Sequence, residues 1–271
     1  MSLRLPGKAL REDREVLAIP VGLSRNEFVL TKITGLRTSP GWRVGEQGVT
    51  EWTLEGFFKQ DERLYLYGPY EPGEFLEEVL PRGAEAALSY LIKLIRGLLA
   101  LREQGREVES LETDAVRFLA GGDVLFLPPA IVKHVRAMLP EAHRLRVYEP
   151  LNHPDFKNPA DRLSFAVASL LWRLITGEYP FAAETGEEVR HRTRYLHLPS
   201  LALVRPGVKE EVAEAVAGGL GRGGGAPTLE RWLELLERWQ AEGLYRSLTE
   251  AETAALSAQA RLAGEQAARS Y

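Results

Sequence analysis

Cysteine is absent from this sequence of 271 residues. The chain therefore has no disulfide, no thiol nucleophile and no cysteine-ligated metal, a composition compatible with a reducing cytosol. It also lacks an uninterrupted apolar run of about 18 residues, the length that a membrane helix needs, and residues 1–13 lack the apolar core of a signal peptide. We expect a cytoplasmic protein with no membrane segment in this chain.

An excess of one charge is also missing. The 34 Lys and Arg residues nearly balance the 38 Asp and Glu residues, which leaves a net charge of -4 at pH 7. This balance gives no electrostatic footprint for nucleic acid. We expect no metal site, because the histidines show no metal-ligand spacing and no cysteine accompanies them; they are His134, His143, His153, His191 and His197. With 45% hydrophobic and 27% charged residues, the chain is predicted to be globular.

An apolar segment from Asp161 to about Thr176 organises the rest of the chain. Its apolar residues cover almost every direction around a helix, which indicates a helix buried in a globular core; they are Leu163, Phe165, Val167, Leu170, Leu171, Trp172, Leu174 and Ile175. Gly177 can supply the left-handed residue that ends a helix, and Pro180 follows where a helix cannot continue. The helix is therefore expected to end near Thr176.

The stretch from Asp161 to Phe181 resembles the central C-lobe helix of the eukaryotic-type protein kinase fold. The shared pattern is a starting Asp, then Ser-Phe and a small residue, a hydrophobic run, and Thr-Gly-Glu-x-Pro-Phe. The resemblance implies an α+β, bilobal fold with a reduced antiparallel β N-lobe and a mostly helical C-lobe. The implied divisions are a lead-in at residues 1–15, the N-lobe at 16–70, the C-lobe at 71–246 and a C-terminal helix at 247–271.

Local patterns predict the elements of this fold. Two β-rich hairpins are expected, the first with its turn at residues 24–26; their strands are Val16–Leu23, Glu27–Thr34, Thr53–Gln60 and Arg63–Tyr70. Apolar periodicity and capping signals predict helices; these are Ala84–Gln104, Glu211–Leu220 and residues 228–240. Gly35–Gly48 is expected to be a loop, because its glycines and proline are poor helix formers.

An active kinase holds nucleotide phosphates with a glycine-rich loop and a strand lysine. This chain has no GxGxxG segment and offers only Gly22 in the corresponding region. Lys32, within Phe-Val-Leu-Thr-Lys-Ile, resembles the lysine of the family's Val-Ala-Ile-Lys strand. The alternative interpretation of Lys32 is a solvent-facing lysine on a strand.

The family's catalytic loop reads His-Arg-Asp-x-x-x-x-Asn, in which the Asp accepts a proton and the Asn holds magnesium. Aligned on the strand that follows, Glu109 takes the Asp position and Asp114 the Asn position. Either the two form a functional pair, as base and cation ligand, or both are solvated loop residues. Leu127, followed by two prolines, stands where the metal-binding Asp of Asp-Phe-Gly belongs and offers magnesium no carboxylate.

Two acidic residues match structural positions of the family. Glu149 precedes Asp161 as the glutamate of Ala-Pro-Glu precedes the central-helix aspartate. Ala226 takes the place of that glutamate's usual arginine partner, which makes Arg222 the nearest replacement. Asp161 is expected to cap its helix and to bind backbone N–H groups of the degenerate loop.

These departures indicate a pseudokinase: a kinase-like scaffold or regulatory module in signalling that is not an enzyme, has no cofactor and does not bind Mg-ATP. A protein partner is expected at the C-lobe surface or the C-terminal helix. That helix either docks on its own domain or, in a longer protein, leads to a membrane segment or a partner helix. The alternatives are a divergent phosphotransferase or a nucleotide-binding switch that uses Lys32, Glu109 and Asp114.

A short basic run occurs at residues 190–194, in which Arg190, His191, Arg192 and Arg194 fall close together. It is expected to be a solvated face, with an acidic or phosphorylated partner as the alternative.

Overall fold

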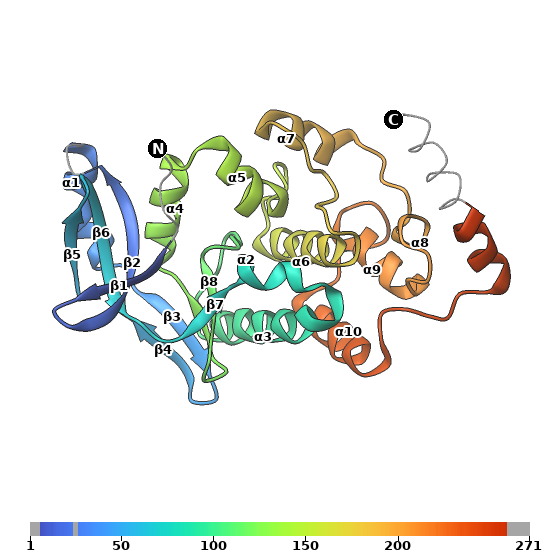
Figure 1. The fold of residues 1–271 in the computed structure, drawn as a ribbon, viewed down its shortest axis with the longest axis horizontal. Helices are drawn as coiled ribbons and strands as arrows, with labels where there is room; N and C mark the ends of the chain where they lie inside the picture. The colour runs from blue at the N-terminus through green and yellow to red at the C-terminus, as the bar shows by residue number, and fades with distance from the viewer. Residues whose placement is uncertain (1–5, 24–26, 259–271) are drawn as a thin grey trace.

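The computed structural model describes residues 6–23 and 27–258, and its architecture is α+β as predicted (Figure 1). Two antiparallel sheets lie toward the N-terminus, and helices make up most of the chain after them. None of the helices within these ranges has both the length and the apolar composition that crossing a bilayer requires.

The first sheet has the strand order β1-β2-β6-β5; its strands are β1 (Gly7–Arg11), β2 (Arg14–Leu23), β6 (Arg63–Pro69) and β5 (Gly56–Gln60). Both hairpins turn through two consecutive residues with positive φ, Glu12 and Asp13 in one and Asp61 and Glu62 in the other. This turn geometry matches the twist of paired strands. The predicted hairpin at residues 53–70 is confirmed, whereas the expected lead-in contains β1.

The prediction of a strand at Glu27–Thr34 is wrong, because these residues belong to helix α1 (Glu27–Arg37). Ile33 and Leu36 are three positions apart on one helical face and pack into the apolar core beside β2. This packing overrides the local strand preference of the β-branched residues. Lys32 is exposed on α1 and is not a strand lysine. The predicted turn at residues 24–26 lies outside the described residues.

The second sheet has the order β4-β3-β9-β8-β7; its strands are β4 (Gly48–Trp52), β3 (Gly41–Gly45), β9 (Val124–Phe126), β8 (Val116–Leu119) and β7 (Gly73–Phe75). The loop expected at Gly35–Gly48 therefore contains β3. A Cβ atom at Gly41 would lie 2.6 Å from the carbonyl oxygen of Phe126. The absence of a side chain at Gly41 thus lets β3 approach β9 closely. A glycine that suggested a loop in the sequence therefore allows two strands to pair.

Helix α6 (Pro159–Thr176) lies at the centre of the helical part, packed against α3 (Ala84–Glu103), α9 (Glu210–Gly219) and α10 (Leu229–Glu242) (Figure 1). These four helices confirm the predictions from apolar periodicity. The left-handed residue after α6 is Gly177, with a φ of 93°. Trp232 and Trp239 of α10 are fully buried, and the Trp232 indole N–H donates to Ser164 Oγ of α6 at 2.8 Å.

Shorter helices connect these long ones in the described part of the chain; they are α2 (Leu76–Val79), η1 (Leu80–Arg82), α4 (Pro129–Met138), α5 (Glu141–Val147), η2 (Glu149–Leu151), α7 (Gly186–Tyr195) and α8 (Leu201–Val204). The sequence patterns predict neither α4 nor α5. Residues 250–258 are helical, in agreement with the expected C-terminal helix. The rest of that expected helix, residues 259–271, lies outside the described residues.

Helix α4 packs between the first sheet and the helical part (Figure 1). Ile131 and Val135, one helical turn apart, share an apolar core with Leu17 and Ile19 of β2. On the same side, the Nε2 atom of His134 lies 2.9 Å from a carbonyl oxygen of β2. The same core continues past α4 to the residues around β9. Apolar packing through α4 therefore joins the first sheet to β8, β9 and the end of α5.

Close packing of α9 on α6 generates a stability prediction. A Cβ atom at Gly219 would lie 2.6 Å from the Cβ of Ala168 and 2.9 Å from the ring of Trp232. Gly219→Ala gains about 0.5–1 kcal/mol of helix propensity, but overpacking costs about 1–3 kcal/mol. We expect a net loss in the unfolding free energy, measured by urea denaturation.

The matched control is Gly224→Ala, because no atom lies within 4 Å of a Cβ built at Gly224. Its unfolding free energy should change by no more than about 0.5 kcal/mol. Equal stability of the two variants would show that α9 can move away from α6 without cost.

Candidate functional site

The loop between α3 and β8 holds the candidate catalytic positions, and backbone hydrogen bonds fix its second half. The Thr113 N–H donates to the carbonyl oxygen of Val147 at 3.2 Å, and the Thr113 carbonyl oxygen accepts from the Glu77 N–H at 3.0 Å. The Ala115 carbonyl oxygen accepts from the Leu127 N–H at 2.9 Å. The loop is therefore held by α2, by the end of α5 and by the segment after β9.

Side chains reinforce this anchoring. Thr113 Oγ1 donates to Glu77 Oε2 at 2.9 Å, and Arg173 Nη1 of α6 lies 3.4 Å from the same oxygen. Arg146 pairs with the other Glu77 oxygen at 3.2 Å. Arg173 also donates to the Tyr179 hydroxyl at 2.9 Å, and burial raises the pKa of Tyr179 to about 12, so the phenol stays neutral. Arg173, in the last turn of the apolar central helix, thus helps to fix the loop.

Glu109 and Asp114, predicted as a catalytic pair, occupy different surroundings. Glu109 is exposed. Asp114 is buried, and its Oδ2 lies 3.3 Å from Nε2 of His143 on α5. Solvation in a loop therefore describes Glu109 but not Asp114. Glu109 borders one cavity and Asp114 a neighbouring smaller one.

Leu127 is buried in the core that joins the first sheet to α4. It follows β9, and Pro129 begins α4 two residues later. Proline is well suited to this first helical position, because its missing N–H would have no partner there. The segment at the expected metal aspartate thus continues into a packed helix. Lys32 borders neither of the two cavities next to Leu127.

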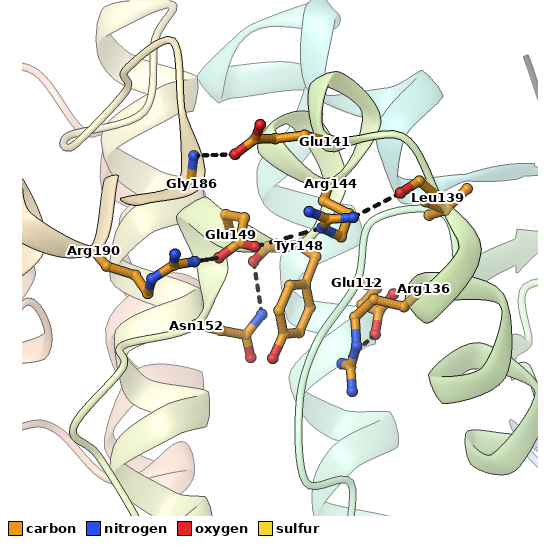
Figure 2. Close-up of polar contacts among 10 residues, drawn as sticks. All are labelled: Glu112, Arg136, Leu139, Glu141, Arg144, Tyr148, Glu149, Asn152, Gly186 and Arg190. Carbon is orange, nitrogen blue, oxygen red and sulfur yellow. Dashed lines mark hydrogen bonds and ion pairs between the residues drawn. The ribbon is translucent and has the colours of Figure 1, made fainter. Parts of the chain in front are cut away.

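A buried acid that the sequence patterns do not single out lies in the same loop. Glu112 is only 3% exposed, and its Oε1 accepts from Arg136 Nη1 of α4 at 2.8 Å. The Arg136 guanidinium lies over the Tyr148 ring, 4.1 Å from its centroid, and Figure 2 shows the three side chains together. Burial, the largest effect, raises the pKa of Glu112 to about 8 although Arg136 lowers it. Only tertiary contact distinguishes Glu112 from its exposed neighbour Glu109.

A cavity of about 290 Å³ opens between residues 106–112 of the loop, α4 and the second sheet. Apolar residues form most of its wall; they are Trp42, Val108, Leu111, Ala115, Val116, Phe126, Leu127, Pro129, Ala130 and Val132. We call the part formed by the buried Glu112 and the half-buried Arg136 the deep end, and the part formed by exposed charged residues the rim. Glu112 borders both this cavity and the smaller one of about 20 Å³ beside it. The two cavities thus share this buried acid, together with Ala115, Leu127 and Val132.

The ion-pair partners of Glu149 differ from the one expected. Its carboxylate pairs with Arg144 of α5 at 3.7 Å and with Arg190 of α7 at 3.5 Å (Figure 2). Arg222, the expected replacement, is not the partner; it lies over the Phe181 ring and donates to the carbonyl oxygen of Thr193. The loop that holds Arg222 is placed by α9, whereas Glu149 faces α7.

Asp161 does not cap its helix. The cap is Asn158, whose side chain accepts from the Ala160 N–H at 3.1 Å, because Pro159 extends α6 two residues further toward the N-terminus than Asp161. Within residues 6–23 and 27–258, Asp161 makes no side-chain hydrogen bond. Its position in the first turn still places a carboxylate at the positive end of the helix.

The basic run on α7 is largely paired within the chain. Arg192 pairs with Glu188 at 2.5 Å and Arg194 with Asp155 at 2.7 Å, in addition to the contact of Arg190 with Glu149. Among the described residues, no group of three or more His, Asp or Glu side chains is arranged to hold a metal ion.

The buried acid predicts a pH-dependent stability. The pKa of Glu112 is about 8 in the folded chain and about 4.3 in an unfolded one. Between these values the folded state binds the additional proton, so the unfolding free energy falls as pH rises. Glu112→Gln should remove part of this fall, on the order of a few kcal/mol between about pH 5 and pH 9. Urea denaturation at several pH values measures it.

The exposed Glu109→Gln is the matched control and should keep the fall of the wild-type chain. A Glu112→Gln variant with the same pH dependence as wild type would mean that Glu112 is ionised in the folded protein.

Comparison with known proteins adds no family to these observations. No model of a known protein family matches the chain, and no curated protein matches it in sequence.

Proposed function

We propose that the chain is a bilobal protein-kinase-like domain that has no phosphoryl-transfer activity and acts by binding another protein. The observation that carries this proposal is the packing of α4. In a kinase-like arrangement the first sheet is the N-lobe, and the nucleotide cleft lies between it and the helical part. Here Ile131 and Val135 of α4 pack against Leu17 and Ile19 of that sheet, so apolar side chains take up the space that a nucleotide would need.

The order of elements supports the kinase-like part of the proposal. Strand β2 contains Leu17-Ala18-Ile19-Pro20, which is similar to Val-Ala-Ile-Lys, and α1 follows it as the glutamate-bearing helix follows in the family. On this alignment Pro20, and not Lys32, stands at the lysine position. Proline has no amine to offer a phosphate. After the first sheet come α3, the anchored loop and the central helix α6, in the family's order.

Three observations weigh against a divergent phosphotransferase that uses Lys32, Glu109 and Asp114. The Asp114 carboxylate is next to His143, Glu109 is exposed, and Leu127 is buried at the position of the metal aspartate. Phosphoryl transfer depends on the positioning of such groups around metal and phosphates.

An exposed apolar segment supports the binding role. The segment from the end of α7 to the end of α8, residues 195–204, contains Tyr195 and Leu203, which are 69% and 75% exposed, and the less exposed Leu196 and Val204. Exposed apolar groups gathered in one region are typical of protein interaction sites. The neighbouring basic run is occupied by internal ion pairs, so we assign recognition to these apolar side chains.

The nucleotide part of the proposal is tested by thermal unfolding with millimolar ATP, with and without magnesium. A ligand at about 100 times its Kd adds about 2.7 kcal/mol of stability, a rise of several degrees in Tm for a chain of this size. We expect no rise, because α4 takes up the cleft. A magnesium-dependent rise would favour the phosphotransferase, and a rise with ATP alone would favour a nucleotide switch.

The binding part is tested by photo-crosslinking in cells that express the chain. A crosslinker at position 203 should reproducibly capture one protein that a crosslinker at position 10 does not. Leu203→Asp should then weaken binding of that purified partner by about tenfold or more, because the contact is desolvated. Leu10, which is also exposed at 69% but lies on β1, supplies the matched control Leu10→Asp. Equal partner affinity of the two variants would exclude residues 195–204 as the docking face.

A further inference from the structure

We propose that the cavity between residues 106–112 and α4 binds a small apolar molecule that bears an anionic head group, with an aromatic carboxylate as the representative chemistry. Glu109 and Leu127, which align with catalytic positions of the kinase fold, border this cavity, but the cavity lies against another face of α4 than Ile131 and Val135. It is distinct from the docking segment at 195–204. The proposal rests on the lining residues alone and does not depend on the function proposed above.

The size and walls of the cavity suit one apolar ring system. Its volume is about 290 Å³, just below the range of about 300–1,000 Å³ that is typical of ligand sites. Val116 and Phe126 of the second sheet line it together with Leu111 and Val132 from the loop and α4. Trp42 also borders the cavity, and Arg106 lies 3.6 Å from its ring centroid.

Helix α4 supplies two of the cationic groups of the site, Lys133 and Arg136, in addition to Arg106 of the loop. Arg136 Nη1 contacts Glu112 at 2.8 Å and Ser110 Oγ at 3.4 Å, and the Tyr148 ring holds the guanidinium from the other side. Lys133 lies three positions before Arg136, so both side chains fall on one face of α4. Lys133 is exposed at the rim of the cavity and forms no ion pair with another described residue.

The charge of the deep end follows from the groups around Glu112. Three groups face Glu112: Arg136 of α4, Asp114 of the same loop, and Tyr148, which directly follows α5. Desolvation keeps the Glu112 carboxyl protonated at neutral pH, so Arg136 has no ionised partner there. The deep end then offers a cation and an O–H donor, which favours a carboxylate through charge-assisted hydrogen bonds. Glu107 and Glu109 border the cavity but are exposed to water.

Three probes with the same ring and different charges test the site: 2-naphthoate, neutral 2-naphthamide and cationic 2-naphthylmethylammonium. Calorimetric titration of the full chain at about pH 6.5 should give naphthoate an affinity about tenfold higher than that of the amide, with the ammonium weakest. Equal affinities, a preference for the ammonium, or no binding of any probe at millimolar concentration would overturn the proposal.

Variants locate the binding. Arg136→Gln should abolish the preference for naphthoate over naphthamide, whereas Arg96→Gln, at an exposed arginine that pairs with Glu237 on α10, should retain it. If Arg136→Gln does not fold, Lys133→Gln at the exposed rim should reduce the preference about threefold. Ala130→Trp, at an exposed position that borders the cavity, should block all three probes. Unchanged naphthoate binding to the Ala130→Trp variant would place the site elsewhere.

A pH series separates recognition from a structural role. Raising the pH from about 6.5 to about 9.5 ionises Glu112. The ionised carboxylate then pairs with the Arg136 guanidinium, which should weaken naphthoate binding about tenfold. Glu112→Gln should bind naphthoate equally at both pH values. An affinity of the wild-type chain that does not change with pH would overturn the assigned head-group site.

Discussion

Apolar packing of α4 against β2 is the contact on which the rest of the molecule depends. Ile131 and Val135 bring the first sheet onto the helical part, and without them the sheet would expose the face that contains Leu17 and Ile19. Burying side chains of this size contributes about 1.5–3 kcal/mol each. The same helix forms one wall of the cavity and provides Arg136. The segment after β9, which contains Leu127 and α4, therefore joins two parts of the core.

The position of α4 determines the electrostatics of the loop that contains Glu112 and Asp114. Once α4 covers the loop, Glu112 loses water and keeps one strong contact, with Arg136. A buried carboxylate beside a single arginine does not recover its full hydration energy, which is why its protonated form is favoured. Asp114, two residues away, has His143 beside it. Two acids in one short loop thus have different partners because different helices pack against them.

Long helices with a clear apolar period could be predicted from the sequence, and elements defined by distant contacts could not. Helices α3, α6, α9 and α10 each bury one face or more, so their pattern is local. The sequence predicts a strand where α1 forms. The helix is favoured because it places Ile33 and Leu36 in the core beside β2, a contact that the local sequence does not reveal. The candidate site divides in the same way: the absence of an acid at Leu127 is a fact of sequence, whereas the burial of Glu112 comes from α4, which no local pattern predicts.

Two faces of α4 connect the cavity to the core beside the first sheet. Ile131 and Val135 face the first sheet, while Val132 and Arg136 face the cavity, about 100° away around the helix. A ligand in the cavity would bind only while α4 keeps its place, since Arg136 and Val132 form part of its site. By linkage, such a ligand stabilises the arrangement in which α4 packs on β2. If the proposed kinase-like arrangement holds, a nucleotide would need α4 displaced from β2, so the two ligands would oppose each other through one helix.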